Sequence, residues 1–407
     1  MGWNGGAAVL IVLTGWLPDQ VRLARRQWTF QQLGHAALAY QMPVLVATPP
    51  HLNAARRRVS GRLYQEQSPP FWTTARMRLP ERCVVYDAMY LSDLRTHRST
   101  YRKLQRDFQQ WEIPYFNPAL PAKDKLYRWL QRDAGEETFA RLPETVYDIT
   151  VEDVPPLFEV CDAWWLKPVY GSGGRNVLYM RRVGRNRWYV AGDRFFRQTV
   201  RTEVDRSGLR RIVGYALRRR RYLAQRHVPL LTSVDGRTLD FRVTVQRGQR
   251  GTWGMTALTA RLSAAGSMLT NYHAGGSIRS LTRQSVEDLN WLARHQLTDI
   301  PLATAVSGAL QIAKRIQQHI AHLGILGVDL GMSQDGRWYV YDCNSRPGRD
   351  ILTDPEVSDF MRGVAGFAAH LLREMSDPDG SPETALAVDG RESETSAADA
   401  CFTEPSP

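Results

Sequence analysis

The chain has 407 residues, 43% of them hydrophobic, and a formal net charge of +12. This length predicts two or three domains with real cores. Its four widely spaced cysteines argue against a zinc cluster and a disulfide framework, which favours a reducing compartment. The apolar run Ala7–Leu13 is too short to span a bilayer, so we expect a buried first strand there and no transmembrane segment.

Residues 1–120 predict an α/β domain. Buried strands and amphipathic helices are expected, the strands at Ala7–Thr14, Pro43–Ala47 and Cys83–Asp87 and the helices at Gln20–Tyr40 and Thr100–Trp111. The stretch His51–Pro80 is rich in Arg, Ser and Pro, and we expect it to be irregular.

Residues 121–375 predict an α+β region, and its pattern changes to extended segments with turn signals after Trp164. A short helix at Lys123–Arg132 and a loop at Leu142–Thr145 come first. The expected strands are Trp164–Lys167, Val177–Arg182, Arg187–Val190, Asp240–Gln246, Thr252–Arg261, Leu326–Gly331 and Trp338–Asp342, and the expected helices are Val286–His295, Thr304–Leu323 and Glu356–Met375. Residues 376–407 are rich in Asp, Glu, Ser, Pro and Ala, so we predict a disordered acidic tail there.

A phosphate-binding loop is the first functional prediction. Only five cationic side chains are lysines, and Lys167 stands at the end of an expected strand, directly before the loop Gly171-Ser172-Gly173-Gly174. A single ammonium beside bare backbone N–H groups suits a phosphate. A strand follows the loop rather than a helix, which excludes Walker A and dinucleotide-binding patterns. A simple turn is the alternative.

A metal site is the second prediction. Asp329 lies in one expected strand, and Asp342 and Asn344 lie at the end of the strand that pairs with it. Residues two apart in a strand face the same side, so these three side chains are expected to meet. Two carboxylates and an amide oxygen suit Mg²⁺. The alternative is that the aspartates only mark strand ends.

Two arginines on consecutive strands, Arg242 and Arg261, are the third feature. Arginines aimed at a transferring phosphoryl group stabilise its developing charge, although an arginine on a basic protein ordinarily has no such role. A second glycine-containing loop, with Asn271 and Gly275-Gly276, follows them.

In chain order the motifs are Lys125, Leu142–Thr145, Lys167 with its glycine loop, Gln225, Asp240-Phe241-Arg242, Arg261, Asn271 with Gly275-Gly276, Asp329, and Asp342 with Asn344. This series resembles the ATP-grasp enzymes. The stretch from about Cys83 to Gly348 is similar, more closely, to the YheC/YheD-type endospore-coat-associated ATP-grasp proteins. The closer match is carried by Val84–Asp87, Ile113–Asn117, Leu326–Leu330 and Asn344–Gly348.

The resemblance implies two α+β subdomains that clasp ATP, preceded by an α/β pre-ATP-grasp domain. It implies nucleotide contacts from Lys125, Lys167, Gly171, Ser172, Gly173, Gly174, Gln225, His227, Val228, Asn271, Gly275 and Gly276, Mg²⁺ ligation by Asp329, Asp342 and Asn344, and contacts to the γ-phosphate, the acid substrate or its acyl phosphate from Arg242, Arg261, Arg346 and Arg349. Typical members activate a carboxylate as an acyl phosphate, which an amine then attacks.

The implied function is therefore an ATP-dependent carboxylate–amine ligase of unspecified substrates, in the cytoplasm and associated with the spore coat or cell envelope. Two departures from the family pattern, Asp342 for a usual Glu and Ala88 for a usual Arg, keep a non-catalytic, nucleotide-binding coat scaffold open as an alternative. A polyanion or nucleic-acid binder is suggested by Arg210-Arg211 and Arg218–Arg221. Nucleic acid is disfavoured, because these clusters lack a recognisable nucleic-acid motif.

Overall fold

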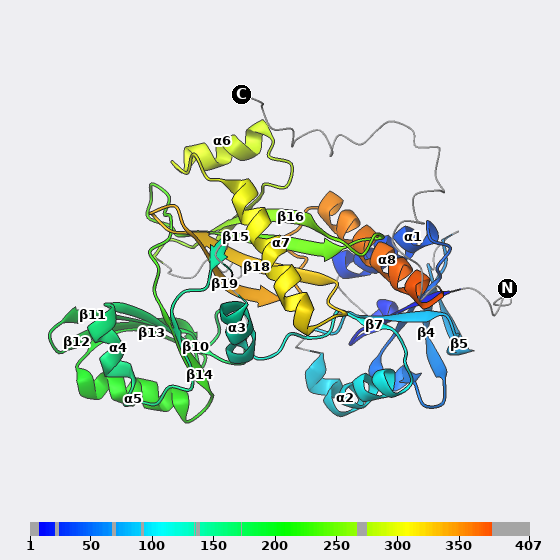
Figure 1. Ribbon diagram of the computed structural model, residues 1–407, viewed down its shortest axis with the longest axis horizontal. Coiled ribbons are helices and arrows are strands. Elements are labelled where there is room, and N and C mark those ends of the chain that lie inside the picture. The colour runs from blue at the N-terminus through cyan, green and yellow to red at the C-terminus, as the bar shows by residue number, and fades with distance from the viewer. Residues whose placement is uncertain are drawn as a thin grey trace.

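A computed structural model describes residues 8–20, 24–66, 71–90, 93–133, 135, 139–171, 173–266 and 275–376. Within them the chain forms three β-sheets with helices packed against them (Figure 1). The predicted acidic tail lies outside the described residues except for Ser376, the last residue of the final helix. Among the described residues, no helix combines the length and the apolar content that crossing a membrane requires.

The first sheet is parallel at its centre, where the strand order is β2 (Val44–Ala47), β1 (Val9–Leu13), β6 (Cys83–Asp87) and β7 (Tyr115–Phe116). Side chains of β1 alternate between two buried clusters. Leu10 and Val12 pack with α1 (Ala24–Leu38), whereas Ile11 packs with α2 (Leu94–Gln110). Helices therefore cover both faces, as in other parallel sheets.

The expectation of an irregular stretch at His51–Pro80 was wrong. After the short elements η2 (Pro49–His51) and β3 (Leu52–Asn53), two strands, β4 (Arg58–Tyr64) and β5 (Trp72–Arg78), pair antiparallel and extend the first sheet beyond β2. They form an outer hairpin whose side chains are largely polar or half exposed. An outer hairpin needs few fully apolar side chains, so its arginines and threonines masked the strand signal.

The second sheet is antiparallel and has the strand order β13 (Gln198–Val204), β12 (Arg187–Phe195), β11 (Leu178–Gly184), β10 (Ala163–Pro168), β14 (Tyr222–Arg226) and β9 (Thr145–Val146). One face packs against α4 (Val154–Val160) and α5 (Arg206–Leu217). Asp205 caps α5 by accepting a hydrogen bond from the Gly208 N–H at 2.8 Å. The sequence analysis did not anticipate α5, β13 or β14.

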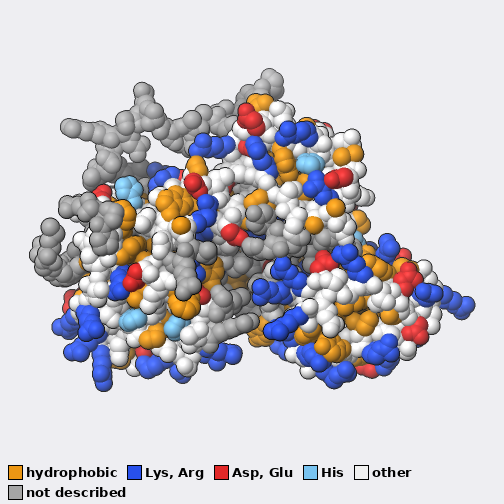
Figure 2. Space-filling view, turned by 180° about the vertical axis from the view of Figure 1, so that it is seen from behind, with side chains coloured by type: hydrophobic (Ala, Val, Ile, Leu, Met, Phe, Trp, Pro, Cys, Tyr) orange, Lys and Arg blue, Asp and Glu red, His pale blue; other side chains and the backbone are white. Residues whose placement is uncertain are grey.

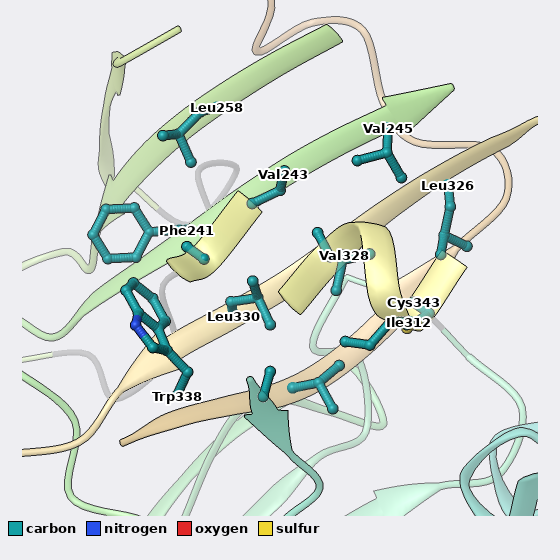
Figure 3. Packing of buried hydrophobic residues seen from close by; sticks show 14 of the residues in the cluster. Phe241, Val243, Val245, Leu258, Ile312, Leu326, Val328, Leu330, Trp338 and Cys343 are labelled. Carbon is teal, nitrogen blue, oxygen red and sulfur yellow. The ribbon is translucent and has the colours of Figure 1, made fainter. Parts of the chain in front are cut away.

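The third sheet supplies one wall of the cavity that is described in the next section. Its strand order is β17 (Ser277–Ser280), β16 (Trp253–Leu262), β15 (Leu239–Arg247), β18 (Ile325–Met332), β19 (Trp338–Asn344) and β8 (Ala140–Arg141). Its buried face packs against α7 (Leu302–His319), with Phe241, Val243, Val328 and Ile312 in one continuous cluster (Figure 3). Alternate residues of the same strands therefore face away from this core.

The remaining helices are η1 (Pro18–Gln20), α3 (Lys123–Arg132), α6 (Val286–Arg294) and α8 (Asp354–Ser376). Helix α8 connects the first sheet to the third, because Phe360 and Phe367 share a buried cluster with Phe30 of α1 and Ile325 of β18. The boundary at residue 120 stays a prediction, and the structure adds that the last helix packs against residues on both sides of it.

Candidate functional site

A cavity of about 420 Å³ is lined by residues of both the second and the third sheets. Its cationic side chains are Lys123, Lys167, Arg175, Arg242 and Arg261, and its acidic ones are Asp240, Asp329 and Asp342. Five cations against three carboxylates leave an excess of positive charge in a confined space. Such a cavity attracts an anionic ligand.

The first wall presents Lys167 from β10. Its ammonium donates a hydrogen bond to Oε1 of buried Gln225 at 2.5 Å and lies 5.3 Å from the centre of the Tyr341 ring. Burial, and to a smaller extent the nearby Lys123, lower the pKa of Lys167 to about 8, although Asp342 and Asp329 act in the opposite direction. The ammonium is thus held in a site that disfavours its charge until an anion arrives.

The glycine loop joins β10 to β11, which pair antiparallel, so the predicted hairpin is confirmed. Gly171, Gly173 and Gly174 line the cavity. Gly173 and Gly174 both have φ of +67°, a conformation that residues with a Cβ adopt with strain. The Asn176 side chain fastens the end of the loop by accepting a hydrogen bond from the Phe196 N–H at 2.7 Å.

Aromatic residues form the apolar part of this wall. The Trp165 indole N–H donates to Nδ1 of His227 at 3.0 Å, and the His227 ring lies 5.2 Å from that of Tyr179. Burial lowers the pKa of His227 to about 4, with help from Arg181. His227 is therefore neutral near pH 7, and this part of the wall suits a flat, uncharged group.

The second wall is a row of ion pairs fixed by strand register. Asp240 of β15 lies opposite Arg261 of β16, and Arg242 lies opposite Asp329 of β18. Arg261 donates to both Asp240 oxygens at 2.7 and 2.8 Å and lies 3.1 Å from Asp329. Arg242 also donates to both Asp329 oxygens. Because residues two apart share a face, this one register places all four charges on the cavity side.

The ion pairs keep the wall charged. Burial alone would raise the pKa of Asp329, but Arg242 and Arg261 outweigh it and hold that pKa well below its usual range. Burial opposes the charge of Arg261 too, and Asp240 and Asp329 raise its pKa. Two arginines and two aspartates thus stabilise one another as ions in a water-poor position.

A β-bulge shapes the end of the wall where Asp342 lies. Asp329 lies opposite Asp342, and the register shifts before the next pair, Leu330 and Val340. The shift lets the neighbouring residues Tyr341 and Asp342 both line the cavity, while regular alternation resumes from Asp342 to Asn344. A bulge of this kind redirects a side chain at a functional site. The Lys123 ammonium, from the first turn of α3, donates to Oδ1 of Asp342.

Most of the residues predicted from the sequence meet in this cavity. Those that line it are Lys167, Gly171, Gly173, Gly174, His227, Val228, Arg242, Arg261, Asp329, Asp342 and Asn344. Gln225 lies behind Lys167, and Gly275 and Gly276 precede β17 and are not among the described lining residues. Ser172 and Asn271 lie outside the described residues.

The structure places Lys123, not Lys125, at the cavity. Lys125 is exposed, and its ammonium lies 5.2 Å from the centre of the Trp129 ring. Side chains two positions apart along a helix point about 200° apart around its axis. Only one of these two lysines can face the cavity, and the start of α3 decides which.

Arg346 and Arg349 also lie away from this cavity. They line a separate space of about 10 Å³ beside Tyr86 and Tyr90. Arg346 donates hydrogen bonds to Asp87 and, at 2.8 Å, to the Tyr101 hydroxyl. The guanidinium of Arg346 is committed to a buried aspartate of the first sheet, and its contact with a substrate carboxylate stays a prediction.

The sequence analysis assigned no role to several lining residues: Lys123, Trp165, Arg175, Leu230, Asp240 and Tyr341. Strand alternation would have found Trp165, two residues before Lys167, and Asp240, two residues before Arg242. Tyr341 had no signal, because its position depends on the bulge. Among the described residues, no group of three or more His, Cys, Asp or Glu side chains is arranged to hold a metal.

The arginines that suggested a polyanion binder are partly neutralised. Arg221 pairs with Asp124 at 2.7 Å and with Asp148 at 2.9 Å, and Arg210 pairs with Glu152 at 2.6 Å. In Figure 2, Asp and Glu side chains are interspersed with the Lys and Arg side chains of the lobe at the lower right. This surface therefore resembles a solvated mixed-charge face.

Comparison with known proteins agrees with this geometry. The YheC/D like ATP-grasp family matches residues 112–371, more than half of the chain. The endospore coat-associated protein YheD of Bacillus subtilis (strain 168) is 24% identical over 321 residues, which cover 75% of this chain and 64% of YheD. YheC of the same organism is 21% identical over 316 residues, which cover 75% of this chain and 80% of YheC. The chain thus spans less than two thirds of the length of YheD.

Among solved structures, D-alanyl-alanine synthetase A from Vibrio cholerae O1 biovar eltor aligns with a TM-score of 0.51 and 11% identity, covering 89% of this chain and 99% of that protein. This likeness shows a shared fold. The mixed α+β architecture is therefore the ATP-grasp fold, and the resemblance seen in the sequence is confirmed. The chain belongs to the YheC/D like ATP-grasp family.

Proposed function

We propose that the chain is an ATP- and Mg²⁺-dependent carboxylate–amine ligase. The observation that carries the proposal is the shared cavity, with Lys167 and its glycine loop on one wall and Asp329 and Asp342 on the other. Phosphate groups need cations and N–H donors, and a divalent ion needs carboxylates. Membership of an ATP-grasp family supports the same function.

In this proposal Lys167 and Lys123 bind phosphate oxygens, and the glycine loop closes over them. The backbone of the segment Gln225–Val228, of which His227 and Val228 line the cavity, contacts the adenine base, with Trp165 as an apolar surface beside it. The phosphate contact that the sequence analysis gave to Lys125 is assigned to Lys123, because of these two lysines only Lys123 lines the cavity. Contacts from the second glycine loop stay a prediction.

Asp329, Asp342 and Asn344 fit a magnesium site. They are hard oxygen donors, they lie on neighbouring strands, and all three line the cavity. A bound Mg²⁺ would neutralise part of the phosphate charge. The cations that pair with the two carboxylates, Lys123 and Arg242, are also suited to phosphate oxygens.

The proposed reaction has two balanced steps. An oxygen of the substrate carboxylate attacks the γ-phosphorus, the bond to the ADP oxygen breaks, and an acyl phosphate forms. The amine then attacks the acyl carbon, the bond to the phosphate oxygen breaks, and the nitrogen loses a proton as inorganic phosphate leaves. We assign stabilisation of the developing charge to Arg242 and Arg261. Positioning supplies the rest of the barrier reduction, without a protein nucleophile.

A turnover assay tests this function. Purified protein is incubated with Mg²⁺, ATP and a library of carboxylates and amines, and ADP release is followed. The proposal expects release that depends on both an acid and an amine. Failure to bind ATP in the presence of Mg²⁺ would contradict it.

A second candidate is a non-catalytic, nucleotide-binding scaffold of the spore coat. Two curated relatives are described as endospore coat-associated, and Asp342 is engaged by Lys123. Nucleotide affinity without ADP release for any substrate pair, together with co-assembly with spore-coat proteins, would favour this candidate. In either case we place the protein in the cytoplasm or at the coat, consistent with the free thiols of the described cysteines Cys83, Cys161 and Cys343.

A further inference from the structure

A buried polar cluster lies next to the loop that follows β19, the strand that carries Asp342 and Asn344. Asp87, at the end of β6, has no exposed surface. Its carboxylate accepts hydrogen bonds from the hydroxyls of Tyr101 and Tyr115, the second at 2.7 Å, and from the Met89 N–H at 3.0 Å. The remaining partner is the guanidinium of Arg346, whose side chain is 8% exposed.

Arg346 links this cluster to the candidate metal site through its own backbone. It follows Asn344 by two residues, and its N–H donates to Oδ1 of Asn344 at 2.9 Å. Asn344 lines the main cavity. Oδ1 of Asn344, the oxygen expected to bind Mg²⁺, is therefore oriented by the backbone of Arg346, and the side chain of Arg346 is held by Asp87 of the first sheet.

A second contact fixes the same turn from the same side. The Asn117 side-chain amide donates to the Ser345 carbonyl at 2.7 Å, while its oxygen accepts from the Ile325 N–H at 3.0 Å. Asn117 is buried and has φ of +64°. It joins the start of β18 to the end of β19, and the turn after Asn344 is tied to the first domain at two consecutive residues.

We propose that Arg346 is a positioning residue, whose pairing with Asp87 sets the orientation of Asn344 for Mg²⁺. This inference deepens the proposed function and rests on it. Outer partners that orient metal ligands typically change metal affinity by about 10- to 100-fold when they are altered. The side chain of Arg346 donates to both Asp87 and the Tyr101 hydroxyl, while its backbone N–H holds Asn344.

The test separates metal affinity from nucleotide affinity. Binding of Mn²⁺ to the ADP complex is measured by electron paramagnetic resonance, and binding of ADP in EDTA is measured by calorimetry. Arg346→Lys should weaken Mn²⁺ binding by about tenfold or more and leave the metal-free ADP affinity unchanged. Tyr101→Phe keeps the charge pair between Arg346 and Asp87 and removes the hydrogen bonds of the Tyr101 hydroxyl to both of them. It should give a smaller loss in the same direction, and it serves if Arg346→Lys does not fold.

Asp288→Asn is the matched control. Asp288 is a buried carboxylate that accepts from Arg279 at 2.7 Å and caps α6, and it does not line the cavity. Its variant should bind Mn²⁺ as the wild type does. Unchanged Mn²⁺ affinity in both cluster variants, or an equal loss in Asp288→Asn, overturns the inference. If the wild type itself fails to bind ADP with Mn²⁺, the proposed function fails instead.

Discussion

The two walls of the cavity are both built from antiparallel strands, but their charged side chains are compensated in opposite ways. The first wall buries one ammonium, Lys167, beside the neutral Gln225 and aromatic rings, and burial lowers its pKa. The second wall alternates Asp240, Arg261, Asp329 and Arg242, so every charge has a counter-charge. The comparison teaches that the first wall is completed by an anionic ligand, whereas the second is already neutralised and has to exchange partners when a ligand enters.

The largest effect is expected from Asp329→Asn on the second wall. This change leaves Arg242 and Arg261, with side chains 14% and 10% exposed, short of a counter-charge, and it should lower the free energy of unfolding by about 3–5 kcal/mol. Asp342→Asn is the comparison, because that side chain is 30% exposed and pairs with a single lysine. It should cost about 1 kcal/mol. Urea unfolding measures both, and equal losses would contradict the charge network.

On the first wall, Lys167→Met should have the opposite pattern. Affinity for ATP with Mg²⁺ should fall by roughly 10- to 100-fold, the value of a charge-assisted bond of about 1.5–3 kcal/mol. The free energy of unfolding should not fall, because the substitution removes a desolvated charge. Calorimetry and urea unfolding provide the two readouts, with the exposed Lys314→Met as a control. Unchanged ATP affinity would remove Lys167 from the nucleotide site.

Lys123 and Lys125 allow a finer comparison, since they belong to one turn of α3. Lys123→Ala should weaken ATP binding by about tenfold, or 1.4 kcal/mol, because its ammonium lines the cavity. Lys125→Ala should leave the affinity unchanged, because Lys125 is exposed beside Trp129. The reverse result would mean that α3 is rotated relative to the cavity.

The smallest effect is a pH dependence that distinguishes the walls. The pKa of Lys167 is lowered from 10.5 to about 8 by burial and Lys123, with Asp342 and Asp329 opposing. ATP binding favours the ammonium, so affinity should fall by about fivefold between pH 8 and pH 9. The sign for stability is reversed: the cost of the buried ammonium is complete below pH 8 and is relieved as pH rises toward 10.5. Lys167→Met should abolish both trends in calorimetric and unfolding measurements.

Alternation and spacing were enough to predict much of the site from the sequence. Asp329, Asp342 and Asn344 meet because register and the two-residue period are local properties of strands. Three features depended on packing instead. The bulge adds Tyr341 to the cavity, the start of α3 selects Lys123 over Lys125, and Arg346 turns away to Asp87, 259 positions earlier in the chain. No local pattern encodes a partner that far away.

The hairpin of β4 and β5 and the helix α5 were missed for another reason. Their exposed faces are rich in arginine, and the signal left for each element was a few buried residues such as Val59 in β4 and Leu209 and Val213 in α5. In retrospect these residues follow strand and helix periods. Where arginine dominates the exposed positions, the periodic spacing of a few buried apolar residues in a short strand or helix is hard to recognise.

A crystal structure with Mg²⁺ and a non-hydrolysable ATP analogue tests the central claim, that one ligand occupies the cavity between both walls. The account predicts phosphate oxygens in contact with Lys167, and a metal ion held by Asp329 and Asp342, in the same cavity. A nucleotide bound elsewhere, or a triphosphate that contacts only one wall, would contradict it.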